Sequence, residues 1–334
     1  MNLYVLEYGS KISTESGKVR VEREDNIVAE YPVEILESLT LSSKCQMTSQ
    51  CIEKLLRYGV SLLWVGFNHS PIGVLTNPGR CNIIRQKRQF DAQADDGFSL
   101  AISRGMISAK VNNQRVILQR HCRDKNDVSV IKNVISELKL YIKKIDTAET
   151  DEILRGYEGY CSKRYFDALR EIVPERFAFD ERTKNPPRDR FSALLSFLYS
   201  LLFNEIMICV TAAGLNPYVG FMHELRNNHP ALVSDMMEEW RGVIADSIAI
   251  RLVKSGTVSP EDFEIMQDGA VYLNRTAAKK VIASFEKKLG SENEYLRRDG
   301  FGNTYRASFG IQTASLCEAL EENNPLLYTA VRIR

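Results

Sequence analysis

Three carboxylates occur at helical spacing shortly after a histidine. His223 follows residues 214–220, where glycine, asparagine and proline are typical of a turn. Asp235, Glu238 and Glu239 then stand at positions i, i+3 and i+4, which in a helix lie along one side. A loop histidine and a carboxylate-lined helix can converge on one cation. Mixed oxygen and imidazole ligands suit Mg²⁺ or Mn²⁺ better than structural zinc, which favours thiolates.

The same pattern also fits a helix face that has no metal. A solvated acidic surface with salt bridges to Arg226 or Arg241 would show the same spacing. Glu158 raises a similar choice in the segment R-G-Y-E-G-Y. A surface acid is common in such a helix, but the glycine beside it would let a backbone or a ligand approach closely. The residues by themselves therefore do not decide between a metal site and a solvated acidic surface.

Several other kinds of chemistry are excluded by their missing motifs. His223-Glu224 begins like the zinc-binding H-E-x-x-H motif, but Asn227 stands where the second histidine is required. There is no P-loop, no G-x-G-x-x-G and no G-x-S-x-G. The seven cysteines are scattered without a C-x-x-C pair. They argue against a zinc ribbon or a disulfide framework and favour reduced thiols in a cytoplasmic protein.

The elements that must position these residues fall into an α+β arrangement. Residues 1–76 contain short β-branched segments, and Lys18–Glu22 alternate with a period of two, as strands do. One helix is expected there, capped by Thr48 or Ser49 and ended by Gly59. We therefore predict a small N-terminal β-rich domain.

A linker and a larger helical domain are expected to follow. N-P-G-R at 77–80 is rich in turn residues, and we place the linker at 77–90. Apolar residues then recur at helical spacing, which predicts an all-α helical bundle over 91–334. The stretch 193–214 is apolar almost all round, but polar residues flank and interrupt it and no second such segment exists. We interpret it as a buried core helix, and expect no secretory signal and no membrane span.

Charge is concentrated locally although the total is small. The formal net charge is +1. Between Arg80 and Lys125, ten basic residues stand against four acidic ones, an excess of six. Such a stretch is often a solvated helix face, but it could also bind nucleic-acid phosphates, because phosphate contacts supply most of the affinity for DNA.

Four segments together resemble the CRISPR-associated adaptation integrase family, whose members insert short DNA fragments into CRISPR arrays. They are R-G-Y-E-G-Y…R-Y-F, N-P-P-R-D-R-F-S-A-L-L-S-F, G-L-N-P-Y-V-G-F-M-H and P-A-L-V-S-D-M-M-E-E-W-R, in this order. The spacing of fifteen residues from His223 to Glu238 matches the family. The β-rich start followed by R-Q-K-R-Q-F matches too, so the resemblance covers nearly the whole chain. The chain departs from the family pattern at Asn185, Ser192 and Gly242, none of which is a ligand position.

The resemblance implies a site and a reaction. The metal ligands and catalytic residues would be Glu158, His223 and Glu238, with Asp235 assisting from behind them. The cofactor would be Mg²⁺ or Mn²⁺, and a DNA 3′-hydroxyl would attack a phosphodiester of the repeat. Candidate phosphate contacts are basic side chains, which need no base readout: Arg85, Arg88, Arg115, Arg120, Arg188 and Arg190.

The resemblance also implies partners. These are double-stranded and branched DNA, a second copy of the chain in a homodimer formed by the β domain, and a small acquisition subunit. Residues 27–41 would supply the strands of the dimer interface. Two other classes stay open at this stage: a catalytically idle DNA-binding module, and a metal-dependent DNA or RNA nuclease without an integration role.

Overall fold

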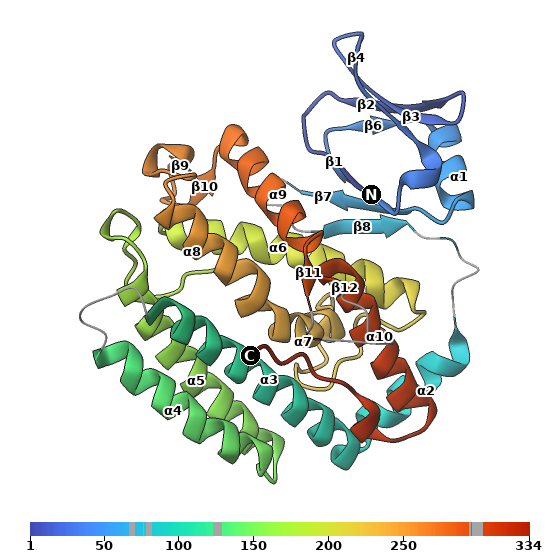
Figure 1. Cartoon of the computed structure of the whole chain (residues 1–334). Coiled ribbons are helices and arrows are strands. Elements are labelled where there is room, and N and C mark those ends of the chain that lie inside the picture. The colour runs from blue at the N-terminus through green and yellow to red at the C-terminus, as the bar shows by residue number, and fades with distance from the viewer. Residues whose placement is uncertain (67–70, 76, 78–81, 123–128, 294, 296–302) are drawn as a thin grey trace. The chain divides into compact units, whose positions relative to one another are not determined.

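The chain forms two compact units, Met1–Asn82 and Ile83–Arg334. A computed structural model describes residues 1–66, 71–75, 77, 82–122, 129–293, 295 and 303–334. The β-rich start and the mostly helical remainder that the sequence predicted are both present (Figure 1). Residues 78–80 of the expected junction lie outside the described part. Residues 83–90, which the sequence analysis places in the linker, belong to helix α2, because this segment contains neither glycine nor proline.

The first unit contains two four-stranded sheets. One has the order β1-β5-β7-β8, in which β5 is parallel to both β1 and β7 and only β8 is antiparallel. The other has the order β4-β3-β2-β6. The strands are β1 (Asn2–Val5), β2 (Lys11–Glu15), β3 (Lys18–Arg23), β4 (Asn26–Pro32), β5 (Ser38–Ser42), β6 (Gln46–Met47), β7 (Ser61–Val65) and β8 (Pro71–Leu75).

Local sequence explains the helix of this unit, α1 (Ser49–Arg57). The Thr48 side chain accepts a hydrogen bond from the Cys51 amide at 3.3 Å, as an N-cap does, and Gly59 has a φ of +76° just after the helix. Leu55 is fully buried in the core between the sheets. The predicted cap and stop are thus confirmed.

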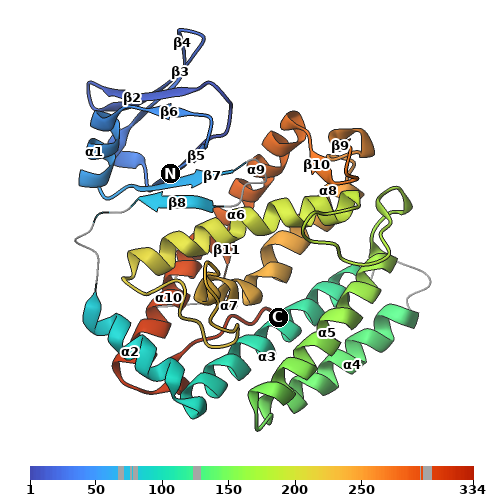
Figure 2. The same ribbon diagram turned by 180° about the vertical axis from the view of Figure 1, so that it is seen from behind.

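The second unit is built around the long helix α3 (Asp96–Cys122), which packs against α4, α5 and α7. Helices α3, α4 and α5 run side by side in both views (Figure 1 and Figure 2). The other helices are α2 (Ile83–Ala94), α4 (Ser129–Asp146), α5 (Asp151–Ile172), α6 (Arg190–Ala212), α7 (Ala231–Trp240), α8 (Ser247–Lys254), α9 (Arg275–Leu289) and α10 (Tyr305–Glu321).

The apolar helix α6 lies in the interior of this unit. By length and composition it could cross a membrane, but 67% of its most apolar window is buried, and it packs against α7 and α10. This agrees with the predicted core helix.

The helical unit also contains two short two-stranded sheets, whereas the sequence predicts only helices in this region. They are β9 (Phe263–Ile265) with β10 (Val271–Leu273), and β11 (Glu292–Asn293) with β12 (Asn303–Thr304). Gly269, with a φ of +77°, lies in the turn between β9 and β10.

Candidate metal centre

Asp235 organises the loop that carries His223. This carboxylate lies on α7, is completely buried, and accepts hydrogen bonds from the amides of Phe221 (2.7 Å), Met222 (3.0 Å) and His223 (3.0 Å). It also lies 2.5 Å from Nδ1 of the His223 ring. Because a carboxylate can only accept, Nδ1 carries the proton and the lone pair stays on Nε2. His223 is therefore held in the tautomer and orientation of a metal ligand or a hydrogen-bond acceptor.

Gly220 is required by this arrangement. A Cβ atom at position 220 would lie 2.4 Å from Oδ2 of Asp235 and 2.8 Å from the backbone carbon of Ala231. Even one methyl group therefore cannot be added without moving the loop away from α7.

We predict that Gly220→Ala lowers the free energy of unfolding by about 1–3 kcal/mol, because it overpacks this contact. Amide hydrogen exchange at Phe221 and His223 should become faster, since their acceptor is displaced. The matched control is Gly156→Ala in α5, where a Cβ would meet nothing within 4 Å. This substitution should stabilise the helix by about 0.5–1 kcal/mol. Urea unfolding and exchange monitored by mass spectrometry give both quantities. Unchanged exchange at the two amides in Gly220→Ala would contradict the prediction.

Glu158 and Glu238 are both ion-paired with Lys110. Lys110 lies on α3, Glu158 on α5 and Glu238 on α7. The Lys110 ammonium forms an ion pair with each of the two carboxylates, and its distance to Oε2 of Glu238 is 2.7 Å. Ser162, one turn after Glu158, donates a hydrogen bond to it at 2.8 Å. Arg241 forms an ion pair with Oε1 of Glu238 at 3.1 Å. The three helices thus gather two acids and two bases into one cluster.

The electrostatics keep this cluster charged at neutral pH. Burial disfavours the ammonium of Lys110, but Glu238 and Glu158 outweigh that effect and raise its pKa. Burial likewise raises the pKa of Glu238, but Arg241 and Lys110, together with His223, lower it to about 2. The pKa of Glu158 is also lowered, because Lys110 outweighs the opposing effect of burial. The influence of His223 on the pKa of Glu238 indicates that the imidazole lies in the neighbourhood of this carboxylate.

Glu239 is directed elsewhere. Its carboxylate is fully buried and accepts hydrogen bonds from the Tyr328 hydroxyl and the Val331 amide, both at 2.5 Å. It therefore anchors the C-terminal segment, which also bonds to Asn113 of α3. The three acids of α7 do not converge on one point, because α7 is buried on all sides: Asp235 holds the loop, Glu238 faces Lys110, and Glu239 holds the chain end. A solvated acidic face is excluded.

A π-helical turn, Arg241–Asp246, continues α7 and links the cluster to a second buried group. The hydroxyls of Tyr165 and Tyr199 donate to Asp246 at 2.8 and 2.7 Å, and burial raises the pKa of Asp246 to about 6 against their effect. The Arg241 guanidinium stacks on the Tyr199 ring, 4.9 Å from its centre. The turn thus holds Arg241 between Tyr199 and Glu238.

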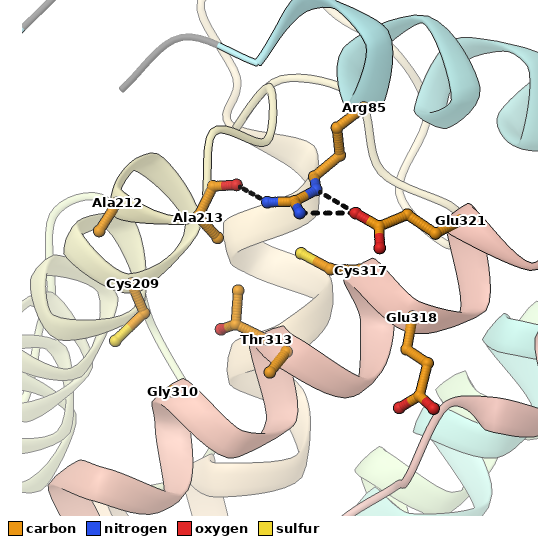
Figure 3. A pocket seen from close by; sticks show the side chains of 10 residues that line it. Arg85, Cys209, Ala212, Ala213, Gly310, Thr313, Cys317, Glu318 and Glu321 are labelled. Atoms are coloured by element: carbon orange, nitrogen blue, oxygen red, sulfur yellow. Dashed lines mark hydrogen bonds and ion pairs between the residues drawn. The ribbon is translucent and has the colours of Figure 1, made fainter. Parts of the chain in front are cut away.

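The basic residues selected from the sequence are distributed over several places. Arg85 binds Glu321 and the carbonyl of Ala213 (Figure 3), and Arg88 donates to the carbonyl of Glu321 at 2.7 Å. The open pocket drawn there is lined by α2, α6 and α10 and by none of the metal-ligand candidates. Arg85 and Arg88 thus help to hold the end of α10.

Of the other four, Arg115 and Arg120 lie on α3, Arg188 precedes α6 and Arg190 is its first residue. Arg115 donates to Asn112 at 3.0 Å, and Arg120 donates to the carbonyl of Arg334 at 2.9 Å. Arg188 donates to the carbonyl of Asp268, and Nε of Arg190 is buried without a hydrogen bond in the described part of the chain. None of the six contacts Glu158, His223 or Glu238 directly in the hydrogen bonds and ion pairs that the structure shows among its described residues.

Sequence reasoning missed Lys110 as a member of the site. It was counted only as part of the basic stretch, yet it is 6% exposed. A signal was present, because Lys110, Asn113 and Gln114 occupy the same helical spacing as the apolar residues Met106 and Ile117. A lysine on a core-facing stripe requires buried partners of opposite charge.

Comparisons with known proteins agree on one family. The model described as CRISPR associated protein Cas1 matches residues 3–287. The CRISPR-associated endonuclease Cas1 of Mycobacterium tuberculosis (strain CDC 1551 / Oshkosh) is 30% identical over 326 residues, which cover 97% of this chain and 95% of that protein. Two solved structures have the same fold.

The first of these is a Cas6-RT-Cas1–Cas2 complex, with a TM-score of 0.85 and 22% identity, where the match covers 100% of this chain and 36% of the other. The second is a casposase bound to its integration product, with a TM-score of 0.83 and 20% identity, covering 100% of this chain and 96% of that one.

Proposed function

Because the chain belongs to the Cas1 family of CRISPR-associated endonucleases, we propose that it joins short DNA fragments to a CRISPR array with a divalent cation held by Glu158, His223 and Glu238. The observation that carries this proposal is that Glu158 and Glu238 both pair with the buried ammonium of Lys110, while His223 influences the pKa of Glu238. These residues come from α5, α7 and the loop before α7. Acids whose pKa values are strongly shifted by charged neighbours are frequent at functional sites.

The donor set fits a hard cation. Two carboxylates and one imidazole are ligands that Mg²⁺ and Mn²⁺ accept. The His223 ring is already fixed through Nδ1 by Asp235, as histidine ligands of metals usually are. Oε2 of Glu238 is buried and, apart from its ion pair with Lys110, accepts no well-aligned hydrogen bond from the described residues. A lone pair on this atom is therefore available to a cation.

The protein's own residues would position the DNA and balance its charge. A bound divalent cation would neutralise charge on a phosphodiester and make a hydroxyl more acidic. Arg241, held between Tyr199 and Glu238, offers a positive group next to the carboxylates. The pKa of Arg182 is lowered by burial, and its guanidinium lies 5.6 Å from the centre of the same Tyr199 ring. Both guanidiniums can stabilise developing charge on phosphate oxygens.

We assign phosphate contacts away from the reacting group to the remaining basic residues. Arg115, Arg120, Arg188 and Arg190 lie on two segments of the helical unit, on α3 and at the start of α6. Arg85 and Arg88 stay in this set. To contact a phosphate, each would have to break its bond to Glu321 or bind Glu321 and the phosphate at the same time.

The proposed partners are DNA, a small acquisition subunit and a second copy of the chain. The Cas1 relative in a complex with Cas2 and the casposase on its integration product support the first two. For the homodimer, β4 is the strand of residues 27–41 that can pair, since it lies at a sheet edge with Ile27 53% and Val28 59% exposed. Strand β5 cannot pair at an edge, because β1 and β7 occupy both its sides.

The decisive experiment supplies a repeat-containing plasmid, short duplex DNA, the partner subunit and Mn²⁺ or Mg²⁺. We expect joined molecules to form with the wild-type chain and to disappear when the cation is chelated. Degraded DNA without joined molecules would identify a simple nuclease instead. Binding of branched DNA without cleavage or joining would identify an idle binding module.

A further inference from the structure

Lys110 occupies the space between the two carboxylates to which the cation is assigned. Its side chain is 8% exposed, and its ammonium is ion-paired with Glu158 and with Oε2 of Glu238 at once. In the described part of the chain, no three histidine, cysteine or acidic side chains are arranged as a ready metal site. The two acids thus face an internal cation rather than an empty coordination sphere.

The charges of this cluster are already balanced. Glu158 and Glu238 contribute two negative charges, and Lys110 and Arg241 contribute two positive charges. Adding a divalent ion beside all four would place two further positive charges in a buried region, where repulsion between like charges is strong. Arg241 has a second contact, the face of Tyr199, whereas the ammonium of Lys110 has no partner besides the two acids in the ion pairs and hydrogen bonds among the described residues.

We propose that Lys110 is an internal competitor of the catalytic cation, which binds Glu158 and Glu238 only when the ammonium leaves them. This inference rests on the metal site of the proposed function. It assigns Lys110 two effects: its charge offsets the repulsion between the two acids in the metal-free protein, and it weakens metal binding. The released ammonium is then free to bind an anionic group such as a DNA phosphate.

The test is the affinity of the full chain for Mn²⁺ without DNA, measured by isothermal titration calorimetry. Lys110→Met keeps the length of the side chain and removes its charge, so we expect the Kd for Mn²⁺ to fall by about tenfold or more. The matched control is Lys184→Met. Lys184 is an exposed lysine of the same neighbourhood. Partial burial of its ammonium and the charge of Arg241 lower its pKa, and Glu238 acts on it in the opposite direction without forming an ion pair with it. Its removal should change the Kd much less.

An unchanged or higher Kd in Lys110→Met would overturn the competition. Glu238→Gln separates this outcome from failure of the metal site itself. If Glu238→Gln loses Mn²⁺ binding while Lys110→Met binds as the wild type does, the site stands and the role of Lys110 falls. If Glu238→Gln also binds Mn²⁺ normally, both fall.

Without Lys110, the repulsion between Glu158 and Glu238 could prevent the variant from folding. Lys110→Gln is the second variant, because its amide can still donate to a carboxylate. The wild type also provides a measurement: acetylation of Lys110, followed by mass spectrometry against exposed Lys139, should become several-fold faster when Mg²⁺ is added. The same acetylation rate with and without saturating Mg²⁺ would refute the release of the ammonium.

Discussion

Glu238→Gln is expected to reduce DNA joining by about 10²–10³-fold, the scale of losing a group that stabilises the transition state electrostatically. Glutamine has the shape of glutamate but lacks the negative charge that attracts a divalent cation. The variant should stay folded, because Lys110 keeps its ion pair with Glu158 and Arg241 keeps its stacking on Tyr199. Rates of joining on the repeat plasmid, at saturating Mn²⁺, measure the effect.

The matched control for this prediction is Glu224→Gln, in the same loop as His223. Glu224 is exposed and paired with Arg155 and Arg226, outside the carboxylate cluster. Its removal should leave the joining rate within about twofold of the wild type, because exposed ion pairs contribute little. His223→Ala should resemble Glu238→Gln. Equal rates in Glu224→Gln and Glu238→Gln would remove Glu238 from the catalytic site.

Among the substitutions proposed for this protein, Glu239→Ala is expected to lower the free energy of unfolding most. It leaves the Tyr328 hydroxyl and the Val331 amide buried without their acceptor, at a cost of about 1–3 kcal/mol each. The control is Glu264→Ala on the exposed strand β9, which should lie within about 0.5 kcal/mol of the wild type. Urea unfolding followed by Trp240 fluorescence in a Trp64→Phe background reports on the helical unit alone. Equal midpoints for the two alanine variants would contradict this role of Glu239.

The pH dependence offers a separate check on Glu239. Burial raises the pKa of its carboxyl to about 8 from 4.5, against the effect of Tyr328 and Val331. The folded state therefore binds a proton more tightly than the unfolded state does. This contribution to stability is complete below pH 4.5 and is lost as the pH rises through 8. Asp246 acts in the same direction, but its pKa is only about 6. Between about pH 6.5 and 8.5, the free energy of unfolding should therefore decrease less with rising pH in Glu239→Ala than in the wild type.

Local signals in the sequence were enough for the architecture and for the turn that precedes His223. Period-two alternation and the cap of α1 follow from contacts within a few residues, so they can be recognised without a fold. The same holds for the apolar helix α6 and for the turn that ends before His223. The short sheets β9–β10 and β11–β12 were missed, because strands of two or three residues leave no periodic pattern.

The proposed ligand set came from the family resemblance of ordered motifs and not from local physics. Spacing alone could not distinguish Glu238 from Asp235 and Glu239, because all three lie within one turn of α7. Their partners come from distant parts of the chain: the Phe221–His223 amides for Asp235, Lys110 for Glu238, and Tyr328 with Val331 for Glu239.

The sequence by itself determined a β-rich unit before a helical one, a loop histidine, and acids at helical spacing after it. Only the tertiary structure decided what each acid does, and it introduced Lys110 between Glu158 and Glu238. The physical reason is that a buried charge is stabilised by whichever opposite charge the fold brings within a few ångströms. Lys110 is 48 residues from Glu158 along the chain, so no local pattern could reveal the pair.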